Sequence, residues 1–145
     1  MSIDIDDIIH MPENELRAYV EENVSYYANN LPVIVCDNSE EYAIAFDDDI
    51  ADAACGGSIE DSVWAFNSAF LSDMTGLDIE VFDALTRSGL CEGANKAILS
   101  IINDTCGIDE FCEAAIDADG RGHFLSPYDG EEIELACGGY AYRIN

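Results

Sequence analysis

Carboxylates are the side chains in this sequence with the clearest chemical potential, because they can coordinate a cation, stand in for phosphate groups or pair with basic side chains. The segment 18–86 contains fifteen acidic residues and no lysine or arginine. Acids are densest over 37–52, where seven of sixteen residues are Asp or Glu. A surface of one charge sign predicts a positively charged partner. The predicted partner-binding residues are Asp37, Glu40, Glu41, Asp47, Asp48, Asp49, Asp52, Glu60 and Asp61.

Two acidic motifs resemble cation sites, but their spacing argues against both. The run 47–49 consists of three adjacent aspartates, which cannot all point the same way on a strand or a helix. The segment 117–120 looks like part of an EF-hand loop. Placing Gly120 at the invariant glycine of that loop puts Ala115 first and Ser126 last, where acids are required. We therefore expect no cofactor and no dedicated metal site.

His123, which lies beside glycines and before an expected strand, is a candidate general base, a common role of histidine. The chain lacks the G-x-S-x-G motif of a serine nucleophile, a Walker loop and a G-x-G-x-x-G motif. A structural histidine bonded to a backbone carbonyl is the simpler interpretation, so we expect no enzymatic activity. A small enzyme or metal-binding protein centred on His123 and nearby acids is the alternative.

The composition limits the class of partner. The 145 residues carry 31 acids against five lysines and arginines, a formal charge of −26. Direct binding to nucleic acid or to an anionic membrane needs a basic patch, which this charge excludes. At 49% apolar residues the chain is not a disordered acidic tail. Its length predicts one domain over 1–145.

The cysteines predict a reducing compartment. No pair has C-x-x-C spacing, the start of the chain lacks a signal-peptide pattern, and no stretch is long and apolar enough to cross a membrane. We expect a cytoplasmic protein with reduced thiols, most of them small buried residues. The six cysteines are Cys36, Cys55, Cys91, Cys106, Cys112 and Cys137.

Helical periodicity predicts several helices, and turn residues predict their ends. The first helix opens at Pro12-Glu13, turns Leu16, Val20 and Tyr27 inward, and ends at Asn29-Asn30. A short alanine-rich helix ends at Gly56-Gly57, and Ser58 begins the next one. In the predicted helix 78–88, the residues expected to face inward are Ile79, Phe82 and Leu85. The predicted helical ranges are 13–28, 47–55, 58–75, 78–88, 92–106 and 109–118.

Short apolar runs between turn residues predict strands at 33–36, 41–46, 123–126, 131–136 and 140–144. Segment 3–11 is either a strand or one helical turn. The expected fold is α+β, with several helices packed on a small antiparallel sheet that includes a C-terminal β-meander. An exposed edge of that meander could pair with a second copy and form a homodimer.

The tail resembles that of known proteins. Residues 120–135, GRGHFLSPYDGEEIEL, and residues 139–145, GYAYRIN, resemble the C-terminal segment of small uncharacterised proteins of phages, plasmids and other mobile elements. This resemblance covers about a fifth of the chain. In size and charge the whole chain is similar to anti-CRISPR and anti-restriction DNA-mimic proteins. That similarity implies a non-enzymatic inhibitor of a host defence complex.

The size of the charge agrees with such mimicry. Duplex DNA carries one charge per ~1.7 Å, so 26 charges correspond to about 44 Å of duplex, close to the ~40 Å diameter of a compact chain of this length. We expect the acids to occupy the nucleic-acid groove of a CRISPR effector or a restriction–modification enzyme. Reversing residues 47–49 to lysine is then expected to abolish binding and preserve the fold. Salt adaptation and a viral structural or assembly role are the other readings.

Overall fold

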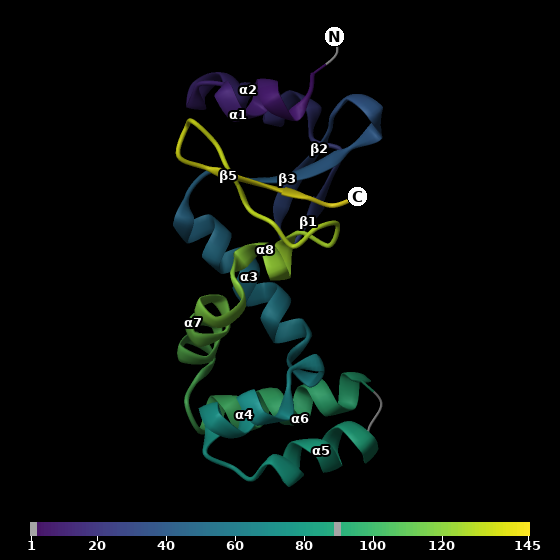
Figure 1. The fold of residues 1–145 in the computed structure, drawn as a ribbon, viewed down its shortest axis with the longest axis vertical. Coiled ribbons are helices and arrows are strands. Elements are labelled where there is room, and N and C mark those ends of the chain that lie inside the picture. Colours follow the sequence, from purple (N-terminus) through teal and green to yellow (C-terminus); the bar gives the residue numbers. More distant parts are fainter. Residues whose placement is uncertain (1–2, 89–90) are drawn as a thin grey trace. The chain divides into compact units, whose positions relative to one another are not determined.

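The computed structural model describes residues 3–88 and 91–145 and confirms the α+β class (Figure 1). The described part contains eight α-helices and a five-stranded antiparallel sheet. It divides into two compact units, one formed by Met1–Cys55 with Asp119–Asn145 and the other by Gly56–Ala118. The single domain over 1–145 stays a prediction.

The first unit contains the sheet, whose strand order is β1-β2-β3-β5-β4. The last strand in sequence therefore lies inside the sheet, because β5 pairs with β3 on one side and with β4 on the other. The strands are β1 (Tyr26–Ala28), β2 (Leu31–Val35), β3 (Glu41–Ala45), β4 (Ile133–Glu134) and β5 (Tyr140–Arg143). The predicted strands at 33–36, 41–46, 131–136 and 140–144 each overlap one of them.

Helices α1 (Ile5–His10) and α2 (Glu13–Asn23) cover one face of this sheet (Figure 1). Leu16 and Val20 lie one helical turn apart on α2 and are both buried, which is the amphipathic spacing predicted for this helix. They belong to one hydrophobic core with side chains from α1, β2, β3 and β5. Segment 3–11, left open between strand and helix, is helical because Asp4 and Asp7 form a capping box.

The prediction of a helix over 13–28 is wrong in its last part, because residues 26–28 form the first strand of the β1–β2 hairpin. Helix α2 ends at Asn23, and Tyr27, expected to face inward, lies in β1 with 66% of its surface exposed. Asn29 and Asn30 have φ values of 51° and 63°. Two successive positive φ values form the type I′ turn that joins tight hairpins, and asparagine tolerates this conformation. The asparagines therefore connect two strands.

Two further segments differ from the predicted elements. The predicted strand 123–126 lies in α8 (Arg121–Leu125), with Ser126 as its C-cap, so the predicted meander is reduced to the β4–β5 hairpin. The pair Gly56-Gly57 does not end a helix, because α3 (Asp48–Asp61) continues through it. Ala51, Cys55 and Ile59 are buried at four-residue spacing, and this apolar burial outweighs the ~1 kcal/mol that each helical glycine costs.

In the second unit, the predicted helix 58–75 is split into three parts. Its start belongs to α3, a 3-10 turn follows at η2 (Val63–Ala65), and α4 (Ser68–Thr75) begins separately. Asn67 is the N-cap of α4, because its side chain accepts a hydrogen bond from Ala69 N at 2.7 Å. Gly76 ends α4 in the left-handed conformation, which agrees with the predicted helix end at residue 75.

The remaining helices of the second unit are α5 (Ile79–Ser88), α6 (Cys91–Asp104) and α7 (Ile108–Asp119). All three overlap predicted helices, but Ile79, expected to be inward, is 41% exposed. Phe66, Phe70 and Phe111 pack together with ring centroids 5.2 to 5.8 Å apart. No helix in the described ranges is long and apolar enough to cross a membrane.

Candidate partner-binding surface

The nine predicted partner-binding acids lie in different environments. Asp37 lies in the 3-10 turn η1 (Asp37–Ser39), Glu40 is the C-cap of that turn, and Glu41 is the first residue of β3; all three are partly buried. The exposed residues Asp47, Asp48, Asp49 and Asp52 lie at the beginning of α3. Glu60 and Asp61 are exposed in the second unit. The predicted set is therefore divided between the two units.

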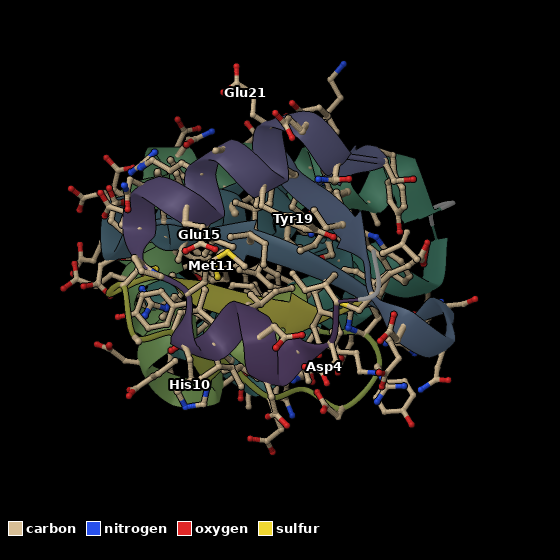
Figure 2. The ribbon with its side chains drawn as sticks, turned by 90° about the horizontal axis from the view of Figure 1, so that it is seen from above. Asp4, His10, Met11, Glu15, Tyr19 and Glu21 are labelled. Atoms are coloured by element: carbon tan, nitrogen blue, oxygen red, sulfur yellow. The ribbon has the colours of Figure 1, made fainter. Side chains whose placement is uncertain are left out.

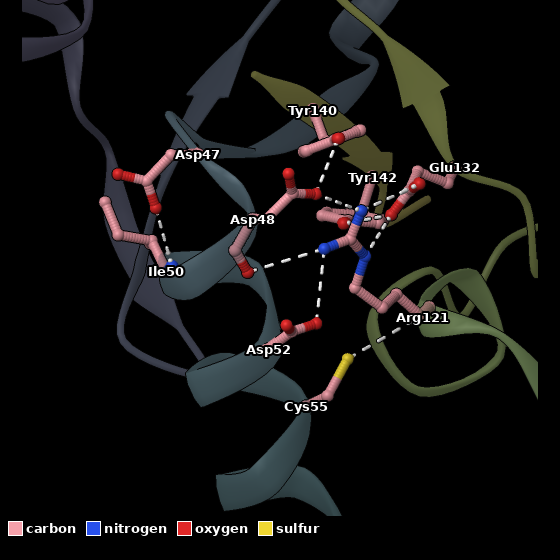
Figure 3. Close-up of polar contacts among 9 residues, drawn as sticks. All are labelled: Asp47, Asp48, Ile50, Asp52, Cys55, Arg121, Glu132, Tyr140 and Tyr142. Carbon is pink, nitrogen blue, oxygen red and sulfur yellow. Dashed lines mark hydrogen bonds and ion pairs between the residues drawn. The ribbon is translucent and has the colours of Figure 1, made fainter. Parts of the chain in front are cut away.

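Arg121 collects three carboxylates around one guanidinium group (Figure 3). Its Nε and Nη2 donate to Oε2 and Oε1 of Glu132 at 2.8 and 3.2 Å, a bidentate pair. Its Nη2 lies 3.0 Å from Asp48 Oδ1, and its Nη1 lies 3.2 Å from Asp52 Oδ1. Only 13% of the Arg121 side chain is exposed. This arginine joins α8, the start of α3 and the segment before β4.

Two tyrosines of β5 complete this cluster. The Tyr140 hydroxyl donates to Asp48 Oδ1 at 2.7 Å, and Arg121 stacks 4.3 Å above the Tyr140 ring. The buried Tyr142 donates its hydroxyl to Glu132 Oε2 at 2.5 Å. The hydrogen bonds from Tyr140 and Arg121 lower the pKa of Asp48. Burial opposes the charge of Arg121, but its hydrogen bonds to Glu132, Tyr140 and Asp48 outweigh burial and raise its pKa.

These contacts change the interpretation of segment 37–61, which contains no basic residue. Arg121 compensates Asp48 and Asp52, and Arg143 lies 3.0 Å from Glu40, so the compensating charges come from the far end of the chain. Asp47 Oδ1 accepts the Ile50 backbone N–H at 2.8 Å and caps α3. Asp47 and Asp48 both stabilise the start of α3 through these contacts. Reversing residues 47–49 to lysine is therefore expected to destabilise the fold, contrary to the expectation that the fold would be preserved.

Comparisons of the chain with protein-family models, with curated proteins and with solved structures gave no match. The resemblance of the tail to mobile-element proteins therefore stays a prediction.

The first two helices carry a second acidic surface, and none of its acids is among the nine predicted partner-binding residues. The basic residues of these helices are His10 on α1 and Arg17 on α2, and Arg17 lies 3.6 Å from Glu13 and 4.3 Å above the Phe46 ring. The sequence shows these acids between residues 4 and 22. Acids on the outer face of a helix are common, so the pattern alone does not indicate a binding surface. The acids of α1, α2 and the preceding cap are Asp4, Asp6, Asp7, Glu13, Glu15, Glu21 and Glu22, all exposed.

His123 is the centre of the alternative enzyme or metal site and lies near the middle of α8. His123 is exposed to solvent and contacts the Phe124 ring edge-on with the ring centroids 4.9 Å apart. Among the described side chains, those of residues 3–87 and 93–145, no group of three or more His, Cys, Asp or Glu is arranged to hold a metal ion.

The cysteines give a pH-dependent prediction. Cys36 is buried among acids, and burial followed by the charge of Glu40 raises the pKa of its thiol from 9.0 to about 11. Burial also raises the pKa of Cys112 to about 11. Since folding favours the neutral thiols, their contribution to stability is complete below about pH 9 and is lost as the pH rises through about 11. No disulfide joins the cysteines that the structure describes.

We therefore expect the urea midpoint of unfolding to fall between about pH 9 and about pH 11. The double substitution Cys36→Ala and Cys112→Ala should make this fall shallower, because it removes two of the groups that titrate there. Burial also raises the pKa of Tyr142, so part of the fall should persist in the double variant. An equally steep fall in both proteins would contradict the assignment to the thiols.

Proposed function

We propose that this protein inhibits a bacterial defence complex by occupying its nucleic-acid-binding groove as an acidic DNA mimic. The target would be a CRISPR effector complex or a restriction–modification enzyme, and the site of action the cytoplasm of the host cell. The protein would act without catalysis. The predicted resemblance of the tail to mobile-element proteins implies no activity by itself, and the similarity of the whole chain in size and charge to DNA-mimic proteins is what favours this role.

One observation supports the proposal above the others. The formal charge is −26, and three of the five basic side chains, Arg17, Arg121 and Arg143, already pair with carboxylates of the same chain. The acids outnumber the bases by 31 to five, so five basic side chains can compensate only a minority of the carboxylates. Such a surface attracts the lysines and arginines that normally contact phosphate.

The mechanism follows from the similarity between carboxylate and phosphate. Both are anions that accept two parallel hydrogen bonds from an arginine, so an arginine that binds the DNA backbone can bind Asp or Glu instead. The inhibitor and DNA would then compete for the same basic groove. Because the attraction is electrostatic, association should be fast and should weaken as salt increases.

A pull-down from bacterial lysate tests this proposal. We expect the immobilised protein to recover a nucleic-acid-binding complex at low salt, and to lose it when duplex DNA or high salt is added. An unrelated acidic protein of similar size and charge serves as the control for unspecific adsorption. Partners that stay bound regardless of both DNA and salt would refute the mimicry.

A cleavage assay with the recovered complex gives the functional readout. The protein should inhibit DNA cleavage, and more DNA should relieve the inhibition, because both ligands compete for one groove. Inhibition that does not depend on the DNA concentration would place the binding site elsewhere and contradict the mechanism.

A further inference from the structure

We infer that the basic partner docks on the face formed by α1 and α2, and that this face takes a polypeptide segment in which basic and apolar side chains alternate. This inference rests on the proposed function and names its contact surface. It moves the contact away from segment 37–61, on which the sequence pattern had concentrated.

The first observation is a groove between α1 and α2, with a volume of about 620 Å³. Ile3, Met11 and Pro12 supply its apolar lining, and Asp6, His10 and Glu15 supply polar lining. Figure 2 shows Glu15 and Met11 in the space between the two helices, whereas Glu21 points away from that space. The groove thus combines carbon surface with carboxylates.

The second observation is a smaller groove between α2 and the strands β1 and β2, with a volume of about 320 Å³. Its lining is mostly apolar and includes Val20, Val24, Pro32 and Phe46. Tyr27 lines the same groove and is 66% exposed. Exposed tyrosine next to an apolar depression is typical of the centre of protein interfaces. Helix α2 therefore has a groove on each side.

Charge complementarity identifies the occupant. Arg17 is the basic side chain on α2, and it is already held by Glu13 and the Phe46 ring. Among the side chains that the structure describes (residues 3–87 and 93–145), the other acids of this face form no ion pair, in contrast to Asp48, Asp52 and Glu40. A simple cation would not use the apolar linings. A polypeptide uses both, since apolar side chains and the carbon stems of arginine fill the grooves while guanidinium groups meet the carboxylates.

Two synthetic peptides of equal charge separate these contributions. The probes are Ac-Arg-Leu-Arg-Leu-Arg-NH2 and Ac-Arg-Gly-Arg-Gly-Arg-NH2, each with a fluorescent label, and polarisation measures their binding to the full chain at low salt. We expect the leucine peptide to bind about tenfold more tightly than the glycine peptide. Each of its two leucines, when partly buried, contributes about half of its full transfer energy, and the two contributions add. Tyr27→Ala and Met11→Ala should reduce this preference, while Tyr128→Ala, at an exposed tyrosine outside both grooves, should preserve it.

Charge-matched variants locate the contact. Glu15→Gln should weaken both peptides about threefold, as expected for the loss of one exposed ion pair, whereas Asp49→Asn should have no effect. Both substitutions remove one exposed negative charge. Circular dichroism of each variant verifies that the fold is retained.

Three results would overturn the inference. They are equal binding of the two peptides, an equal or larger effect of Asp49→Asn, and a dimer that Tyr27→Ala or Glu15→Gln dissociates in light scattering, which would assign the face to a second copy. None of them would affect a DNA-sensitive pull-down, so the docking surface and the proposed function can fail separately.

Discussion

Replacing Arg121 with alanine should lower the free energy of unfolding by about 3 kcal/mol, the loss typical of breaking a buried ion pair. The arginine side chain is 13% exposed and that of Glu132 is 25% exposed. Without Arg121, the charge of Glu132 would stay largely buried with the Tyr142 hydroxyl as its remaining described hydrogen-bond donor. Urea unfolding followed by circular dichroism measures this loss.

Two further variants test the reason for this loss. Arg121→Lys should recover only part of the stability, because lysine keeps the charge but cannot form the bidentate pair with Glu132. Arg17→Ala serves as the control, since its ion pair with Glu13 is about half exposed on both sides and should contribute at most about 0.5 kcal/mol. Similar losses for Arg121→Ala and Arg17→Ala would mean that the Arg121 cluster does not stabilise the fold.

Replacing Gly122 with alanine should lower the free energy of unfolding by about 3 kcal/mol, the upper part of the range for overpacked positions. A Cβ atom at this position would overlap the backbone carbonyl oxygen of Gly130 and lie 2.7 Å from the carbonyl carbon of Glu131. Because backbone atoms cannot rotate away as a side chain can, α8 or the loop before β4 would have to move. Urea unfolding of the purified variant measures the loss.

Gly57→Ala is the matched control and should have the opposite sign. Gly57 lies inside α3, and a Cβ atom there would meet nothing within 4 Å. Alanine in a helix interior is favoured over glycine by about 1 kcal/mol, so this variant should be more stable than the parent. A Gly122→Ala protein as stable as the parent would show that α8 does not pack against the 130–131 backbone as described.

The Arg121 cluster also affects how the charge is distributed for binding. It uses Asp48 and Asp52 to connect α3 with α8, so these carboxylates are less available to an external basic partner. The acids of α1 and α2 are outside this cluster. The segment richest in acids is therefore not the surface richest in unpaired carboxylates. A basic partner is expected to bind where the carboxylates are unpaired.

Much of the secondary structure could be predicted from local patterns. The periodic apolar residues of α2 and α6 and the alternating pattern of β3 indicate the correct element type, because a side chain's face depends only on its position within one helix or strand. Ala94, Ile98 and Ile102 of α6 are buried at four-residue spacing, as on one face of a helix. The net charge likewise follows from composition alone, and so does the prediction of a basic partner.

Other features depended on contacts between residues distant in sequence. Asn29-Asn30 is compatible with a helix end and with a hairpin, and the pairing of Tyr26 with Val33 selects the hairpin. The glycine pair in α3 was expected to end the helix, but burial on both sides of it extends the helix. In both cases the local preference is about 1 kcal/mol, which tertiary packing readily exceeds.

The sequence by itself determined the α+β class, most of the helices and the excess of acids. Only the tertiary structure decided which acids are compensated, because Arg121 and Asp48 are 73 residues apart and meet through the folding of α8 against α3. The same applies to the two grooves beside α2, whose walls come from residues 3–46. Local patterns specify which face of an element is apolar, whereas the position of a charge relative to its partners is a property of the packed chain.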